Sequence, residues 1–445
     1  MSKPDRFIHP ESLIPLVNEL RSGKLNLTAY IERALARIAE AEPRIQALLP
    51  EEGRPERLKS EATTLESRFP DPAGRPPLFG VLVGIKDIFA TDGFETRAGS
   101  RLPPELFRMK EGPLVAALKR AGALVLGKTV TTEFAFFAPG PTANPWNPAH
   151  TPGGSSSGSA AAVAAGYCSL ATGTQTIGSI SRPAAFCGIA GWKPSYERTS
   201  RAGIVPFSPS VDHAGLFAAD AAGLALAAPL VIPDWNVRAF TTARDGLAVR
   251  PLVALVPDGQ YLEQTTPAAR AVFERQIESL AGSGVEIRRI MALPDIAAIN
   301  ARHRRICAAD LARVHRSWFA EYEELYSTTT ADLIHTGLMI SDEELERDKR
   351  GCLMLRSELD RALQGADFWL SPAAPGPALA GLSSTGDPVM NLPWTHAGVP
   401  TIAIPDGLSD DGLPLGLQLA GSFGHDEKLL AISMVTEKLL AEANA

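Results

Sequence analysis

The 445-residue chain lacks the cysteine and histidine patterns that mark disulfide-bonded and zinc-binding proteins. Its four cysteines include no CxxC pair, so we expect reduced, buried thiols rather than redox or zinc chemistry. The eight histidines are scattered and form no HExxH motif. Residues 153–159 do not follow the phosphate-binding pattern GxxxxGK[ST], and no GxGxxG turn opens a βαβ unit. We therefore predict that the protein uses no metal and no cofactor.

Long apolar runs and an excess of positive charge are also missing. The longest uncharged apolar run, residues 221–232, is shorter than the roughly 20 residues that cross a bilayer. Residues 1–10 contain no apolar stretch of the kind found in secretory leaders. The net charge of −7 disfavours nucleic-acid binding, which usually needs a basic surface. We expect a cytoplasmic protein that binds neither membranes nor nucleic acid.

The patterns that are present indicate an α/β protein. We expect a helical N-terminal part over residues 1–75. Within it, apolar residues recur at the helical spacing 31, 34, 35 and 38, and the preceding Thr28 is a candidate N-cap. Apolar runs at 80–85 and 123–126 flank a helical stretch at 114–120, which indicates strand–helix–strand alternation. Further on, we predict strands at 252–256, 285–290, 368–370, 399–404 and 415–419, and helices at 266–281, 295–325, 341–363 and 426–440. A single domain spanning 1–445 is the simplest organisation, with a core at about 80–215 and a C-terminal part, 250–445, completing the sheet.

Lys86 follows one of these apolar runs and precedes Asp87. A lysine held among Val83, Ile85 and Ile88 would be desolvated, which lowers its pKa and lets it act as a general base. A nearby Asp87 carboxylate would raise that pKa, but neighbouring strand residues point to opposite faces. We therefore expect desolvation to dominate. A solvated surface pair is the alternative interpretation of the same two residues.

Residues 153–159 read Gly-Gly-Ser-Ser-Ser-Gly-Ser. They contain a formal G-x-S-x-G centred on Ser156, but a hydrolase elbow needs a preceding strand, and prolines at 145, 148 and 152 prevent one. A flexible linker is disfavoured because the segment runs directly into the Ala-rich helix predicted at 160–165. A Ser-His-Asp triad stays open, since its members need not be close in sequence.

Residues 173–179 form a glycine-punctuated segment that ends at Ser179. We interpret it as a turn whose successive backbone N–H groups point at one place and form an anion nest. A serine at the end of such a turn could attack a carbonyl while those N–H groups stabilise the oxyanion. An ordinary loop is the alternative interpretation.

Together these segments resemble the amidase signature family. The segment 84–87 is similar to that family's catalytic-lysine motif, 152–159 to its Gly/Ser-rich motif, and 173–188 to its nucleophile motif. The resemblance covers most of residues 10–440. It implies an α/β/α sandwich around a large mixed β-sheet. It also implies that Ser179 is the nucleophile, Lys86 the base, and Ser155 a bridging serine held by a cis non-proline peptide.

The mechanism implied is an acyl transfer. Neutral Lys86 takes a proton from Ser155, which takes one from Ser179, and the Ser179 oxygen attacks the amide carbonyl. Ser155 then protonates the leaving nitrogen, and water hydrolyses the acyl-enzyme. The oxyanion hole implied consists of the backbone N–H groups of Thr176, Ile177, Gly178 and Ser179. The predicted function is hydrolysis of a linear amide, with esters, anilides and carbamates as further substrates to be tested.

The chain departs from the common family pattern at three positions. Gln175 replaces an acid, Ser181 replaces an arginine, and Ile177 replaces a frequent glycine. Arg182 lies one place later and is a candidate substitute for the missing arginine. We expect the chemistry to persist, but these departures prevent the substrate from being inferred from the family.

Other functions fit parts of the pattern. The amidotransferase subunit that amidates mis-acylated tRNA usually carries a Tyr-Asp-Gly segment, which this chain lacks. A non-catalytic binding protein would have lost Lys86, Ser155 or Ser179, and all three are present. We expect a small-molecule amide, ester or carbamate as partner, and a homodimer is left open. Candidate substrate-binding residues are Phe134, Phe136, Phe137 and Trp394.

Overall fold

The computed structural model describes residues 6–247 and 250–443. Residues 1–5, half of the segment in which we expected no secretory leader, lie outside this description. Residues 444–445 lie outside it as well. Ten strands are present: β1 Leu82–Lys86, β2 Leu124–Thr129, β3 Leu170–Gln175, β4 Ala190–Lys193, β5 His213–Ala218, β6 Val253–Asp258, β7 Glu286–Met291, β8 Phe368–Pro372, β9 Thr401–Leu408 and β10 Pro414–Ala420.

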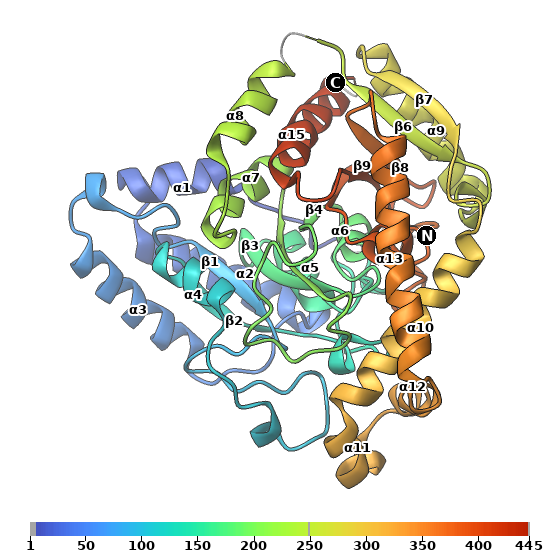
Figure 1. The fold of residues 1–445 in the computed structure, drawn as a ribbon. Coiled ribbons are helices and arrows are strands. Elements are labelled where there is room, and N and C mark those ends of the chain that lie inside the picture. Colours follow the sequence, from blue (N-terminus) through green and yellow to red (C-terminus); the bar gives the residue numbers. More distant parts are fainter. Residues whose placement is uncertain (1–5, 248–249, 444–445) are drawn as a thin grey trace.

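These strands form one mixed sheet in the order β2-β1-β3-β5-β4-β9-β10-β8-β6-β7 (Figure 1). The pairs β1–β2, β1–β3, β6–β7 and β6–β8 are parallel, and the others are antiparallel. The first five strands of the order come from the N-terminal half of the chain and the last five from the C-terminal half. The halves meet where β4 pairs with β9, with Trp192 opposite Ile402. The predicted α/β fold with a large mixed sheet is confirmed.

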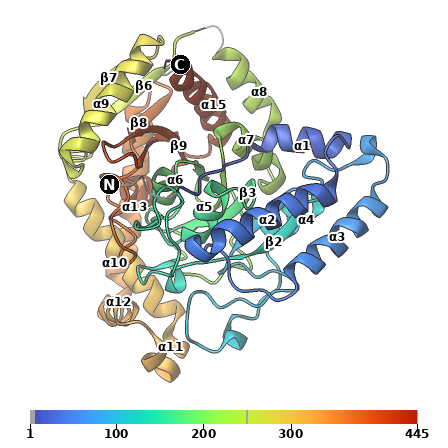
Figure 2. The same cartoon turned by 180° about the vertical axis from the view of Figure 1, so that it is seen from behind.

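Helices surround this sheet (Figures 1 and 2). Helix α5 packs on β1, β2, β3 and β5, α6 packs on β4, β9 and β10, and α7 and α15 pack on strands at the centre of the sheet. Within the described ranges, no helix is long and apolar enough to cross a membrane. The α-helices are α1 Leu13–Ser22, α2 Leu27–Ile45, α3 Arg54–Arg68, α4 Pro113–Arg120, α5 Ser157–Ala164, α6 Ser181–Cys187, α7 Ala221–Val231, α8 Val237–Gly246, α9 Pro267–Gly282, α10 Ile296–Val314, α11 Arg316–Tyr322, α12 Thr328–Leu338, α13 Asp342–Ala362, α14 Leu392–Ala397 and α15 Asp426–Ala443.

Local sequence explains where several helices begin. In α2 the buried residues recur every three or four positions, and the cap is Asn26, whose Oδ1 accepts from Ala29 N–H (3.0 Å), rather than the predicted Thr28. Helix α13 begins with a capping box between Ser341 and Glu344. The helical stretch predicted at 295–325 is found, divided at His315 into α10 and α11 and ending in a short 3-10 helix at Glu323–Leu325.

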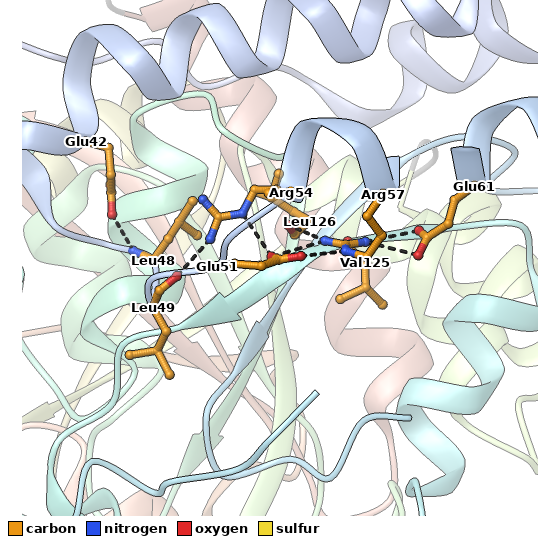
Figure 3. A network of polar contacts seen from close by, with 9 residues as sticks. All are labelled: Glu42, Leu48, Leu49, Glu51, Arg54, Arg57, Glu61, Val125 and Leu126. Carbon is orange, nitrogen blue, oxygen red and sulfur yellow. Dashed lines mark hydrogen bonds and ion pairs between the residues drawn. The ribbon is translucent and has the colours of Figure 1, made fainter. Parts of the chain in front are cut away.

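A partly buried ion network links helix α3 and the segment before it to the edge of the sheet (Figure 3). The Arg57 guanidinium donates to the carbonyl oxygens of Val125 (2.9 Å) and Leu126 (3.1 Å) on β2. Glu51 accepts from Arg57 and from Arg54 (3.0 Å). The network therefore covers carbonyl groups of an edge strand, which would otherwise be open to pairing with another chain. It also supports β2, the neighbour of the strand that carries Lys86.

Candidate functional site

Lys86 is the last residue of β1, and its side chain enters a cluster of hydroxyl groups. Its Nζ lies 2.8 Å from Ser155 Oγ, 3.0 Å from Ser156 Oγ and 2.8 Å from Thr174 Oγ1. The neighbouring strand β3 supplies Thr174, and Thr172 of the same strand accepts the Lys86 backbone N–H (2.9 Å). The contacts of Ser156 and Thr174 were not predicted, although both residues lie inside the two motifs that the sequence singles out.

Burial dominates the electrostatic environment of Lys86. The side chain is fully buried, and this burial lowers the pKa of Lys86 well below its usual value, although the charge of Asp212 acts in the opposite direction. Asp87 turns away, as predicted, and forms an ion pair with Lys128 (2.9 Å). The prediction that desolvation outweighs Asp87 is confirmed.

Ser155 and Ser179 come together from two loops. Ser155 precedes α5, Ser179 lies between β3 and α6, and the Ser155 backbone N–H donates to Ser179 Oγ (3.1 Å). The close approach depends on Gly154, which has φ +62°. A Cβ there would stand 3.2 Å from the Ser179 Cα and 2.7 Å from Pro183.

The cis peptide expected at Ser155 is not found. The described chain contains no cis peptide bond, and the turn is made instead by Gly153 and Gly154 in left-handed conformation. The backbone N–H of Ser155, rather than its hydroxyl, therefore contacts Ser179 Oγ. No hydrogen bond joins the two serine hydroxyls within the part of the chain that the structure covers.

The segment 176–179 presents four backbone N–H groups that donate to no other group of the described residues. Its carbonyl groups, in contrast, are held at three successive positions. His303 Nε2 lies 2.8 Å from Thr176 O, Thr395 Oγ1 donates to Ile177 O (2.8 Å), and Arg182 N–H donates to Gly178 O (3.1 Å). In a trans peptide the carbonyl and the following N–H point in opposite directions. Fixing the carbonyl groups on one side thus directs the N–H groups to the other.

Two buried histidines provide the first of these anchors. A carbonyl only accepts, so His303 Nε2 carries the hydrogen that binds Thr176 O, and His303 Nδ1 is bare. His396 Nδ1 lies 3.3 Å from that bare nitrogen and must be its donor. Burial lowers the pKa of His303 to about 4 and that of His396 to about 2, so both rings are neutral near pH 7. The role of His303 was not predicted, because this residue is distant in sequence from the motifs.

The unusual Gln175 has a structural role. Its Oε1 accepts the backbone N–H groups of Ile180 (2.8 Å) and Ser181 (2.9 Å), and its Nε2 donates to Thr395 Oγ1 (3.0 Å). The amide therefore ties the turn after Ser179 to α14 without any charge. Ser181, where an arginine was expected, is buried and lies 3.4 Å from Thr401 Oγ1. Gln175 and Ser181, which stand where the family pattern has an acid and an arginine, thus both form contacts between uncharged groups.

A small cavity of about 10 Å³ contains Ser179, which is 8% exposed. Of the four aromatic candidates, Phe136 and Phe137 line this cavity. Phe134 is buried edge-on against His315 (ring centroids 4.5 Å apart), and buried Trp394 donates its indole N–H to the Tyr261 hydroxyl (2.9 Å). These two aromatic side chains therefore belong to the packed core and not to the cavity wall.

A larger cavity of about 410 Å³ adjoins the hydroxyl cluster on the side of Thr174 and Thr176. It shares Ala135 and Phe207 with the small cavity, and its polar wall includes Asp212. Among the described residues, no group of three or more histidine, cysteine, aspartate or glutamate side chains is arranged to hold a metal ion. The chemistry available here is that of hydroxyl groups, one buried amine and free backbone N–H groups.

Comparisons with known proteins reveal similar sequences and a similar overall fold. The sequence model of a family described as Amidase matches residues 29–430. A glutamyl-tRNA(Gln) amidotransferase subunit from Synechococcus sp. (strain RCC307) is 32% identical over 465 residues, covering 93% of this chain and 94% of that protein. A crystal structure of an amidase superposes with a TM-score of 0.85 at 31% identity, covering 97% of this chain and 100% of the other. The native peptide amidase of Stenotrophomonas maltophilia gives a TM-score of 0.83 at 26% identity, covering 97% of each chain.

Proposed function

Because this chain belongs to the amidase family, we propose that it cleaves a carboxamide through an acyl-enzyme on Ser179, with Lys86 as base and Ser155 as proton relay. The observation that carries this proposal is the buried amine of Lys86, which contacts only hydroxyl groups and lies 2.8 Å from Ser155 Oγ. Burial favours the neutral form of this amine, and a neutral amine is a competent base.

The contacts of Lys86 suggest where its lone pair points. A neutral amine has two N–H groups and one lone pair. Ser156 Oγ donates to Thr174 O (3.2 Å), so its oxygen is free to accept one N–H of Lys86. Thr174 Oγ1 accepts the other, and the lone pair then faces the Ser155 hydroxyl. This orientation suits removal of a proton from Ser155.

The relay from Ser155 to Ser179 is completed in this proposal when the substrate binds, as often happens with catalytic hydrogen bonds. Ser179 Oγ attacks the carbonyl, and the free N–H groups of residues 176–179 stabilise the oxyanion. One such donor is typically worth about 3 kcal/mol. Ser155 returns its proton to the departing nitrogen, and water then releases the acid from Ser179.

A second candidate differs in the fate of the nitrogen. The curated relative is named as one subunit of an amidotransferase, which favours transfer to an acceptor with the help of partner chains. The names of the amidase and the peptide amidase favour hydrolysis by a single chain. Both candidates share the acyl-enzyme on Ser179. The absent Tyr-Asp-Gly segment leads us to place hydrolysis first.

The test is a screen of the purified chain against simple amides, anilides, esters and carbamates. Hydrolysis with accumulation of an acyl group on Ser179, detected by mass spectrometry, is the expected result. Ser179→Ala should abolish turnover, whereas Ser433→Ala, a matched change at a buried serine of α15, should not. Nitrogen release that appears only with glutamyl-tRNA, ATP and partner chains would favour the amidotransferase. Acylation of Ser156 in place of Ser179 would refute both assignments.

A further inference from the structure

Arg182, in the first turn of α6, is a buried cation with few partners. The side chain is 1% exposed, and its one hydrogen bond to a side chain runs from Nη2 to Thr385 Oγ1 (3.3 Å). Its Nε and Nη1 have no hydrogen-bond partner in the described chain. Burial lowers the pKa of Arg182 to about 10, so the guanidinium is charged near neutral pH. A buried ion is costly unless it is paired, and most of the five N–H groups of this one are unused.

The described residues provide no ion-pair partner for Arg182. Asp387 is the carboxylate whose charge acts on it, but Asp387 is exposed, and its Oδ1 accepts from the Val389 backbone N–H (3.1 Å). Other buried cations among the described residues have partners. Lys128 pairs with Asp87 at 2.9 Å, the Lys86 amine contacts three hydroxyl groups, and Lys193 donates to the carbonyl oxygens of Pro194 and Val399. Arg182 differs in leaving two donor nitrogens, Nε and Nη1, without a hydrogen-bond partner in the described chain.

The position of Arg182 connects this missing charge with the chemistry. Arg182 lines the same small cavity as Ser155 and Ser179. The other cavity residues include Phe136 and Phe137, and no acidic residue is among them. An anion that entered this cavity would therefore contact the Arg182 guanidinium, which is shielded from water and lies beside the proposed nucleophile. Charge-assisted hydrogen bonds are strong in such a place.

We propose that Arg182 binds a carboxylate of the substrate, so that the protein selects short amides that carry a negative charge on the acyl side. This inference rests on the proposed acyl-enzyme chemistry and adds the substrate class to it. The small volume around Ser179 requires a short spacer between the amide and the carboxylate. A guanidinium suits this task because its planar set of donors matches a carboxylate.

The experiment compares kcat/KM for oxamate, malonamate, succinamate and glutaramate, which differ in spacer length. The control for succinamate is 4-methylpentanamide, in which an uncharged isopropyl group replaces the carboxylate. We expect the wild type to prefer the charged amide by about 10- to 100-fold, the range for hydrogen bonds to charged groups. Arg182→Met should remove this preference, and Arg182→Lys should keep part of it. Arg108→Met, at an exposed arginine, should leave it unchanged.

A binding measurement separates this proposal from the enzymatic one. The Ser179→Ala protein, and the same protein with Arg182→Met added, are titrated calorimetrically with the amide carboxylates. Binding that is at least about tenfold weaker without Arg182 supports the carboxylate site even if no amide is turned over. If neither series is hydrolysed by the wild type, the proposed function fails. If amides are hydrolysed but charged and uncharged ones react equally, or if Arg182→Met keeps the preference, the carboxylate site is refuted.

Discussion

Replacing His303 should slow catalysis without weakening substrate binding. His303 is fully buried on α10, and its Nε2–H holds the Thr176 carbonyl, so the Ile177 N–H points to the opposite side of that peptide. His303→Leu removes this donor. Because an oxyanion forms only in the transition state, we expect kcat for amide hydrolysis to fall while KM stays close to the wild-type value.

The size of the effect follows from the contacts that remain. Complete loss of one oxyanion donor typically lowers kcat by about 10²- to 10³-fold. In His303→Leu the next two carbonyl groups stay anchored, Ile177 O by Thr395 and Gly178 O by the Arg182 N–H. The lost hydrogen bond, with a carbonyl left unpaired, is worth about 1–3 kcal/mol. The Ile177 N–H is therefore loosened rather than removed, and we expect a decrease of about 10- to 100-fold.

The assay measures kcat and KM for one amide with the wild type, His303→Leu and His303→Gln. The Gln amide nitrogen can stand in for the ring Nε2, so His303→Gln should recover much of the loss. His335→Leu, at an exposed histidine of α12, is the control, and thermal unfolding verifies that each variant is folded. Wild-type kcat in folded His303→Leu would refute the reasoning, and so would equal losses in the Leu and Gln variants.

Three further predictions concern charge and metals. The rate of amide hydrolysis should rise as pH increases through the lowered pKa of Lys86, because only the neutral amine accepts a proton. Lys86→Ala should remove this rise. A pH–rate profile that is unchanged in the variant would contradict the role of Lys86 as the base. Lys128→Met should leave Asp87 buried and unpaired, and should lower the free energy of unfolding, measured in urea, by about 3–5 kcal/mol. Adding Asp87→Leu should restore most of this loss. Equal stability of the wild type and the single variant would show that the ion pair is unimportant. Metal chelators should leave activity unchanged, since no described cluster of side chains is arranged for a metal, and a loss that one added metal ion reverses would contradict this.

Local sequence patterns predicted part of the fold because the spacing of apolar residues depends on the type of secondary structure. The apolar run before Lys86 became β1, and the helical spacing behind residue 28 became α2. The strands β3, β4 and β5 were missed. They are buried on both faces and rich in small residues, as in the sequence Leu-Ala-Thr-Gly-Thr-Gln of β3, so they show no alternation of polar and apolar residues. For the same reason, the turn predicted at 173–179 proved to be strand as far as Gln175.

The site was predicted only as far as its motifs reach. Lys86, Ser155 and Ser179 lie in three recognisable segments, and the structure brings all three together. His303 and the unpaired Arg182 gain their roles from tertiary contacts with residues far away in the chain, Thr176 and Thr385 respectively. No short-range pattern encodes such contacts. The same is true of Phe134, whose aromatic neighbours in the core come mostly from distant parts of the chain.

Two of the three anchors on the segment 176–179 come from the last third of the chain. Lys86, Ser155 and Ser179 are all made before the ribosome reaches residue 182, whereas His303 and Thr395 are made much later. A nascent chain therefore carries its three reactive side chains long before the carbonyl groups beside them can be fixed. Under the proposed mechanism, Ser179 becomes fully competent only after the last third of the chain has folded onto the segment 176–179.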